Sequence, residues 1–152
     1  MDNLLKSKTR LAFIQIIFEN LSTKKNIKEI YKNFDINYKG IVVKNFQDKG
    51  EIKFEFSSNF LKKLTNYYYD YTKDGNFLNL IDRYILFKRN FKKWDLINQS
   101  ILLASLSELH STEQNKIKIV INDYLNVGKS FIDDKEIKTI NAIIDKIIYD
   151  RK

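Results

Sequence analysis

The tripeptide Gly128-Lys129-Ser130 is how a phosphate-binding P-loop ends, so nucleotide binding is the first chemistry to consider. The full pattern, G-x-x-x-x-G-K-[ST], needs another glycine five residues before Gly128, where this sequence has Asp123. A carboxylate there repels phosphates and obstructs the tight anion-binding turn. The residues before the tripeptide are amphipathic, which predicts a helix that continues through it. We therefore expect no nucleotide site.

Other residues that support catalysis or metal binding are sparse. His110 is the only histidine and there is no cysteine, so a metal-ligand cluster of the usual kind is not expected. We place His110 near a helix end. Asp133 and Asp134 precede an isoleucine-striped segment, where acidic residues cap a helix and complement its dipole. The sequence predicts no catalysis, no cofactor and no metal.

Basic residues suggest a third chemistry, the binding of a polyanion. The formal net charge is +8. Lys and Arg outnumber Asp and Glu by ten to five in residues 1–50 and by nine to six in 51–100, and the two are equal at eight in 101–152. Basic side chains release counterions when they meet phosphates, so nucleic acid is a candidate partner. An overall abundance of lysine explains the same excess.

A cluster of tyrosines has two interpretations. Tyr67, Tyr68, Tyr69 and Tyr71 lie among lysines, as in surfaces that stack single-stranded nucleic acid; the lysines are Lys62, Lys63 and Lys73. At helical spacing we favour the second interpretation, in which most of these rings belong to a core or an interface.

Apolar spacing predicts helices for most of the chain, which contains no proline. Residues 7–20 open with a possible Ser7 cap and are apolar on two sides, which predicts a central helix of a bundle. Further helices are expected over 27–36, from Ser57, after Gly75, over 94–110, through the Gly-Lys-Ser tripeptide and in the final segment. The prediction is an all-α fold of about seven helices in a single domain, residues 1–152.

Residues 40–56 are ambiguous. Ile52, Phe54 and Phe56 alternate with charged residues after a turn-like Asp48-Lys49-Gly50 (residues 48–50), which is typical of a β-hairpin. The alternative is a loop followed by the start of a helix.

No apolar run approaches the roughly 20 residues needed to span a bilayer, so we expect no membrane association. The N-terminal residues lack the apolar region of a secretion signal, and the absence of cysteine excludes a disulfide framework. These features predict a cytoplasmic protein.

Three linked motifs near the C-terminus resemble the NusB family of transcription antitermination factors. Glu108-Leu109 ends one predicted helix, Val120-Ile121-Asn122-Asp123 with Lys129 and Phe131 marks the next, and residues 140–145 (INAIID) mark the last. At the N-terminus, Lys6, Lys8 and Arg10 resemble the family's arginine-rich run, and Gln15 follows at the family's spacing. The middle of the chain, about 25–95, matches poorly.

This resemblance implies two packed three-helix bundles and no enzyme activity. It also implies binding of single-stranded boxA-type RNA of nascent ribosomal RNA together with NusE, a small-subunit ribosomal protein, within an RNA polymerase antitermination complex. Lys6, Lys8 and Arg10 would contact phosphates, and Gln15 would lie at a polar site beside the RNA. The family's loop and early third helix favour loop plus helix at residues 40–56.

Departures from the family keep other functions open. The basic run is thinned, Thr139 stands where many relatives have phenylalanine, and Leu103 replaces a usual arginine. The alternative function is a helical protein-interaction module with weak or no specific RNA binding. A NusB-like part of an RNA methyltransferase would need a further cofactor-binding domain, for which we expect no room in 152 residues.

Overall fold

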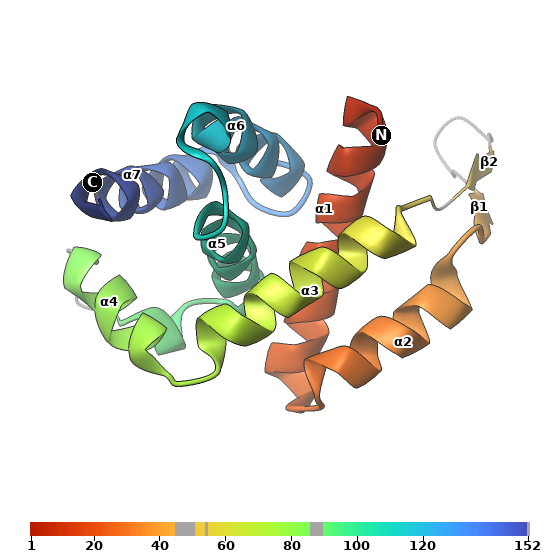
Figure 1. Cartoon of the computed structure of the whole chain (residues 1–152), viewed down its shortest axis with the longest axis horizontal. Helices are drawn as coiled ribbons and strands as arrows, with labels where there is room; N and C mark the ends of the chain where they lie inside the picture. Colours follow the sequence, from red (N-terminus) through yellow and green to blue (C-terminus); the bar gives the residue numbers. More distant parts are fainter. Residues whose placement is uncertain (45–50, 54, 86–89, 152) are drawn as a thin grey trace.

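The computed structural model describes residues 1–44, 51–53, 55–85 and 90–151. Within these ranges seven α-helices account for most of the chain, as predicted (Figure 1). Short 3₁₀ turns at Phe91–Lys93 and Gln114–Lys116 precede the fifth and sixth helices. The helices are α1 (Asn3–Thr23), α2 (Ile27–Tyr38), α3 (Ser58–Thr72), α4 (Asn76–Tyr84), α5 (Leu96–Leu109), α6 (Ile117–Gly128) and α7 (Asp134–Arg151).

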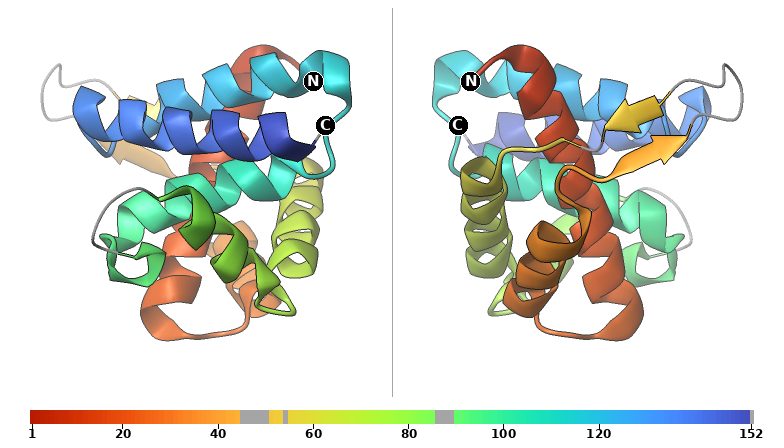
Figure 2. Two further views of the ribbon diagram at one scale, coloured as in Figure 1. Left: turned by 90° about the vertical axis from the view of Figure 1, so that its left-hand side faces the viewer. Right: turned by 90° about the vertical axis from the view of Figure 1, so that its right-hand side faces the viewer.

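The helices form two groups of three. Helices α1, α2 and α3 pack on one another, α5, α6 and α7 form the second group, and α4 packs against α7. The largest contact between the groups joins α1 to α5, which Figure 1 shows nearly end-on between α1 and α7. Figure 2 shows α6 and α7 side by side along one edge of the molecule. The predicted all-α fold of two three-helix bundles is confirmed.

Helix α1 is central, as its two apolar faces predicted. Phe13, Ile14 and Ile17 are completely buried, and the Phe13 ring meets the edge of Tyr68 on α3 at a centroid distance of 6.4 Å. The predicted start at Ser7 is wrong. The helix begins a full turn earlier because Asp2 caps it, with Oδ1 accepting the Leu5 N–H at 2.7 Å.

The expectation of loop plus helix at residues 40–56 is also wrong, because the backbone forms a short antiparallel pair. Strand β1 (Val42–Lys44) pairs with β2 (Glu51–Lys53), with Val43 opposite Ile52. The predicted turn at 48–50 and Phe54 lie outside the described residues. Phe56 is buried after β2 and packs on Phe34 of α2 at 5.4 Å, and this contact anchors a hairpin that would be marginal alone.

The Gly-Lys-Ser tripeptide ends a helix and forms no phosphate loop. Helix α6 runs to Gly128, and the next residue's N–H still bonds the Leu125 carbonyl at 3.2 Å. A Cβ on Gly128 would come within 3.0 Å of Ile137 Cδ1 on α7 and 3.5 Å of Ile101 Cγ2 on α5. The glycine is therefore what lets α6 end against both neighbours.

The N-terminus of α7 follows at once and is capped as predicted. Asp133 Oδ1 accepts the Glu136 N–H at 2.8 Å, in the arrangement of a capping box. None of the helices in the described ranges is long and apolar enough to cross a membrane.

We predict that Gly128→Leu lowers the free energy of unfolding by about 1–3 kcal/mol, because the new side chain overpacks the contact with Ile137 and Ile101. The matched control is Lys129→Leu, since Lys129 is exposed at the next position and should change stability little. Urea unfolding followed by circular dichroism measures both. Equal stability of the two variants would contradict a tight junction at Gly128.

Candidate nucleic-acid interface

The four residues predicted to contact RNA all lie in the first two thirds of α1, but they do not share one face. At 100° per residue, Lys8 and Gln15 fall within about 20° of each other. Lys6 and Arg10 lie together on the roughly opposite side. Lys6, Lys8 and Gln15 are half-buried, whereas Arg10 is only 6% exposed. The structure therefore separates the predicted residues into two pairs, and one of the four is enclosed.

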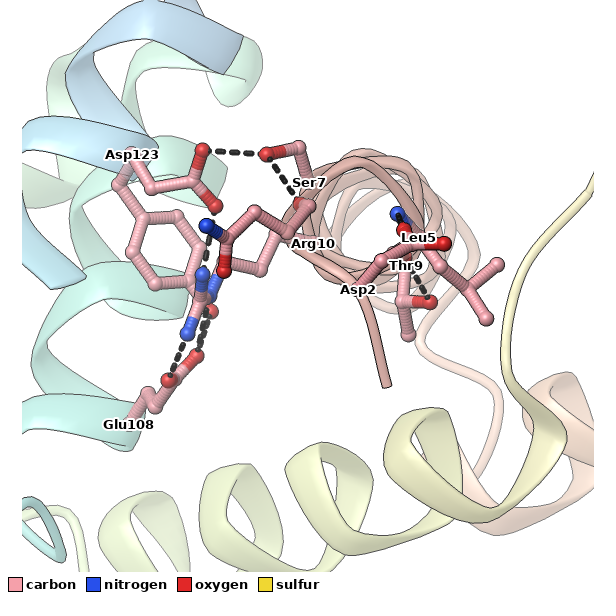
Figure 3. Close-up of polar contacts among 9 residues, drawn as sticks. Asp2, Leu5, Ser7, Thr9, Arg10, Glu108 and Asp123 are labelled. Carbon is pink, nitrogen blue, oxygen red and sulfur yellow. Dashed lines mark hydrogen bonds and ion pairs between the residues drawn. The ribbon is translucent and has the colours of Figure 1, made fainter.

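Arg10 is held by two carboxylates from the second helix group (Figure 3). Its Nε donates to Glu108 Oε1 at 2.9 Å and its Nη2 donates to Glu108 Oε2 at 2.7 Å, so the pair is bidentate. Its Nη1 donates to Asp123 Oδ2 at 2.6 Å. A single side chain thus joins α1 to α5 and α6.

Neighbouring groups complete this cluster. The Tyr124 hydroxyl donates to Glu108 Oε1 at 2.7 Å, and Ser7 Oγ donates to Asp123 Oδ1 at 2.6 Å. The guanidinium carbon of Arg10 lies 5.5 Å from the ring centroids of both Phe60 and Tyr124. Both carboxylates are therefore hydrogen-bonded from more than one side, which a buried charge requires.

The electrostatics of the cluster favour a charged arginine and a neutral tyrosine. Burial opposes the charge on Arg10, yet its hydrogen bond to Glu108 and the charge of that carboxylate outweigh burial and hold the arginine pKa above its ordinary value. Burial raises the pKa of Tyr124 well above its ordinary value, and the charge of Glu108 raises it further. Arg10 therefore stays charged and Tyr124 stays neutral across the physiological pH range.

A second attachment ties the start of α1 to α3. Thr9 Oγ1 accepts the backbone N–H of Ser57 at 2.9 Å and donates to the Leu5 carbonyl at 2.7 Å. Ser57 in turn caps α3 by accepting the Phe60 N–H. The N-terminal turns of α1 are thus fixed between α3 on one side and α5 and α6 on the other.

Lys6 and Lys8 differ from Arg10 in having no carboxylate within ion-pair distance among the residues that the structure describes. Their charges are therefore available to an external anion. Arg10 has no such freedom, because all three of its nitrogens donate within the protein. Helix α1 therefore presents two lysines without an ion-pair partner among the described residues, and the buried Arg10 sets the position of that helix.

Sequence reasoning missed the role of Glu108 and Asp123. Both residues stood in the family motifs, and Asp123 also excluded a P-loop, but neither was expected to contact Arg10. The signal available was an arginine on one predicted helix and one acid on each of two others. Nothing in the sequence indicated that these three residues meet.

Two of the positions that depart from the family pattern lie in the second helix group. Leu103 is buried in α5 and Thr139 is half-buried on α7.

In the described part of the chain no group of three or more acidic or histidine side chains is placed to hold a metal ion. His110 ends α5, and its ring packs on Tyr71 at 5.6 Å.

We predict that Arg10→Met destabilises the fold by about 3–5 kcal/mol, because it leaves Glu108 buried without a cation. Adding Glu108→Gln to Arg10→Met should recover part of that loss, and a double-mutant cycle measures the coupling. The matched control is Lys116→Met, which removes an exposed 3.9 Å pair with Glu113 and should cost at most about 1 kcal/mol. Similar losses from Arg10→Met and Lys116→Met in denaturant unfolding would contradict a buried pair.

Comparison with known proteins shows to which family this fold and these motifs belong. A transcription antitermination protein NusB of Rickettsia bellii is 24% identical over 148 residues, which cover 97% of this chain and 92% of that protein. The NusB protein of Blochmanniella floridana is 38% identical over 63 residues, 41% of this chain and 46% of that protein.

A solved structure supports the fold independently. One chain of "Crystal Structure of a Plectonemic RNA Supercoil" superposes with a TM-score of 0.73 at 16% identity and covers 97% of this chain and 96% of its own. The model of the NusB family matches residues 7–149. Since that match spans nearly the whole sequence, this protein belongs to the NusB family.

Proposed function

We propose that this protein is a transcription antitermination factor that binds single-stranded boxA-type RNA together with NusE and acts within an RNA polymerase antitermination complex. The observation that carries the proposal is family membership over residues 7–149. The names of its NusB relatives and the basic character of the first two thirds of the chain support it.

In this proposal Lys6 and Lys8 contact RNA phosphates, and Gln15 offers a polar contact beside Lys8. Both lysine charges are uncommitted among the described residues, as an electrostatic contact to phosphate requires. Because Lys6 and Lys8 lie on nearly opposite sides of α1, the RNA would pass around the N-terminal end of the helix.

The contribution of Arg10 to RNA binding is indirect in this proposal. Three of its five N–H donors are used by Glu108 and Asp123, and the side chain is only 6% exposed, so little of it is open to a phosphate. We therefore assign Arg10 the role of a positioning residue, which sets where α1 presents Lys6 and Lys8.

One observation also favours the alternative function, a protein-interaction module with weak RNA binding. The only arginine of the basic run is enclosed, which leaves two lysines without arginine's bidentate geometry. In that case NusE or another protein would be the main partner, and RNA would bind weakly or without specificity.

We predict that Lys6→Ala combined with Lys8→Ala weakens binding of boxA-type RNA. The double variant should also lower the slope of log affinity against log salt by about 1.4, because each single-strand phosphate contact contributes about 0.7. Fluorescence anisotropy over a salt series, with and without NusE, measures both quantities. The matched control is Lys135→Ala with Lys138→Ala, two exposed lysines on α7.

A scrambled RNA of the same length tests specificity. Equal affinity for both RNAs, with and without NusE, would refute specific recognition. Binding of NusE alongside equal affinity for both RNAs would favour the interaction-module alternative. An unchanged salt slope in the Lys6/Lys8 variant would show that the RNA lies elsewhere on the protein.

A further inference from the structure

A basic and aromatic surface lies along α3 and the start of α2, on different helices from Lys6, Lys8 and Gln15 of α1. We call it the α2–α3 surface and define it by Lys28, Lys62, Lys63, Tyr67 and Tyr69. Its three lysines are exposed, Tyr69 is 42% exposed and Tyr67 is half-buried. The surface lies on the three-helix group formed by α1, α2 and α3 (Figure 1).

The structure sorts the four clustered tyrosines into two kinds. Tyr68 is buried, with its ring edge on Phe13 and its hydroxyl bonded to Asn20 Oδ1 at 2.8 Å. Tyr71 packs on Phe77 and is half-buried. Tyr67 is likewise half-buried and packs against the core, and Tyr69 is the exposed ring of the four, at 42%. The expectation that most of these rings belong to a core or an interface is therefore confirmed, with Tyr69 as the exception.

A lysine ammonium group lies over the ring of Tyr69 and another over the ring of Tyr67. Lys28 Nζ lies 4.4 Å from the centroid of Tyr69, and Lys63 Nζ lies 5.9 Å from that of Tyr67. A cation held over a ring that still exposes surface combines the two elements that bind single strands, a charge for the phosphate and a π-face for the base.

The exposed stripe of α3 is net positive, and its lysines form no ion pair within the described residues. From the second turn onward the exposed residues recur every three or four positions; they are Lys62, Lys63, Asn66, Tyr69, Asp70 and Lys73. Asp70 is the one acid among these six. In the described ranges none of these lysines, nor Lys28, has a carboxylate within ion-pair distance.

The start of α3 lies beside the candidate interface on α1. Helix α3 begins beside the first turns of α1, where Ser57 bonds Thr9 and the Phe60 ring lies against Arg10. From Lys62 to Lys73 the stripe extends about 16 Å along the helix axis. This proximity would let a strand bound at the N-terminal end of α1 continue onto the stripe.

We propose that the α2–α3 surface is a second contact for single-stranded RNA, which binds phosphates through its lysines and stacks a base on Tyr69 without reading sequence. This inference rests on the proposed RNA-binding function but concerns a different surface. A sequence-tolerant contact of this kind would hold RNA that flanks the specifically bound element.

An oligouridylate of 24 nucleotides tests the surface without any boxA-type sequence. Tyr69→Ala should weaken its binding about 5- to 150-fold, the effect of losing one stacked base, and leave the salt slope unchanged. Tyr69→Phe keeps the ring and should bind like the unmodified protein. Lys62→Ala with Lys63→Ala should lower the salt slope by about 1.4, and the Lys135/Lys138 control variant should not.

These outcomes separate the inference from the proposed function. The protein could show no preference for boxA-type RNA while the Tyr69→Ala and Lys62→Ala/Lys63→Ala variants still bind the oligouridylate more weakly. That result would refute the proposed function but support this surface. The inference is overturned if Tyr69→Ala and Lys62→Ala/Lys63→Ala each bind the oligouridylate within twofold of the control variant. It is also overturned if polyglutamate binds as tightly as the RNA and is weakened equally by these variants, since the surface would then serve an acidic protein partner.

Discussion

The buried pairing of Arg10 with Glu108 and Asp123 is the constraint on which the arrangement of the two helix groups depends. A guanidinium and two carboxylates removed from water are costly unless each finds its partners, and here every nitrogen of Arg10 donates to a carboxylate. That requirement is met only when α1, α5 and α6 occupy one relative position. A purely apolar contact would tolerate sliding, whereas a bidentate pair does not. The cluster therefore specifies where α1 sits more than it adds to net stability.

The hydrophobic contact of α1 with α5 supplies the rest of that position. Helix α5 is buried over nearly its whole length, including three serines that would be costly without partners. Ser100, Ser105 and Ser107 each donate to the carbonyl four residues earlier, so their hydroxyls are satisfied within the helix. Small, internally bonded side chains let neighbouring helices approach closely.

The fold class was predictable because helical periodicity is local. The seven helices, the central place of α1 and the cap at Asp133 all follow from residues within a few turns of one another. Local residues also indicated the hairpin, because apolar and charged residues alternate there. We nevertheless expected loop plus helix, which the resemblance to the family favoured. The local sequence also contained the earlier start of α1, since Asp2 is as good a cap as Ser7. For the hairpin, the neighbouring residues were a better guide than the family.

The sequence by itself determined the helices, the excess of basic charge, the exclusion of a P-loop and the motifs that mark the family. Only the tertiary structure decided which of those charges are free. Arg10 and its partners are separated by 98 and 113 residues, and helical periodicity says which face a residue occupies but not what lies opposite. The same limit applied to Tyr67, Tyr68, Tyr69 and Tyr71, which share a composition and a helix yet divide between core and surface. Burial depends on where distant helices pack. A lysine left in solvent and an arginine enclosed by two acids therefore cannot be told apart from the sequence alone.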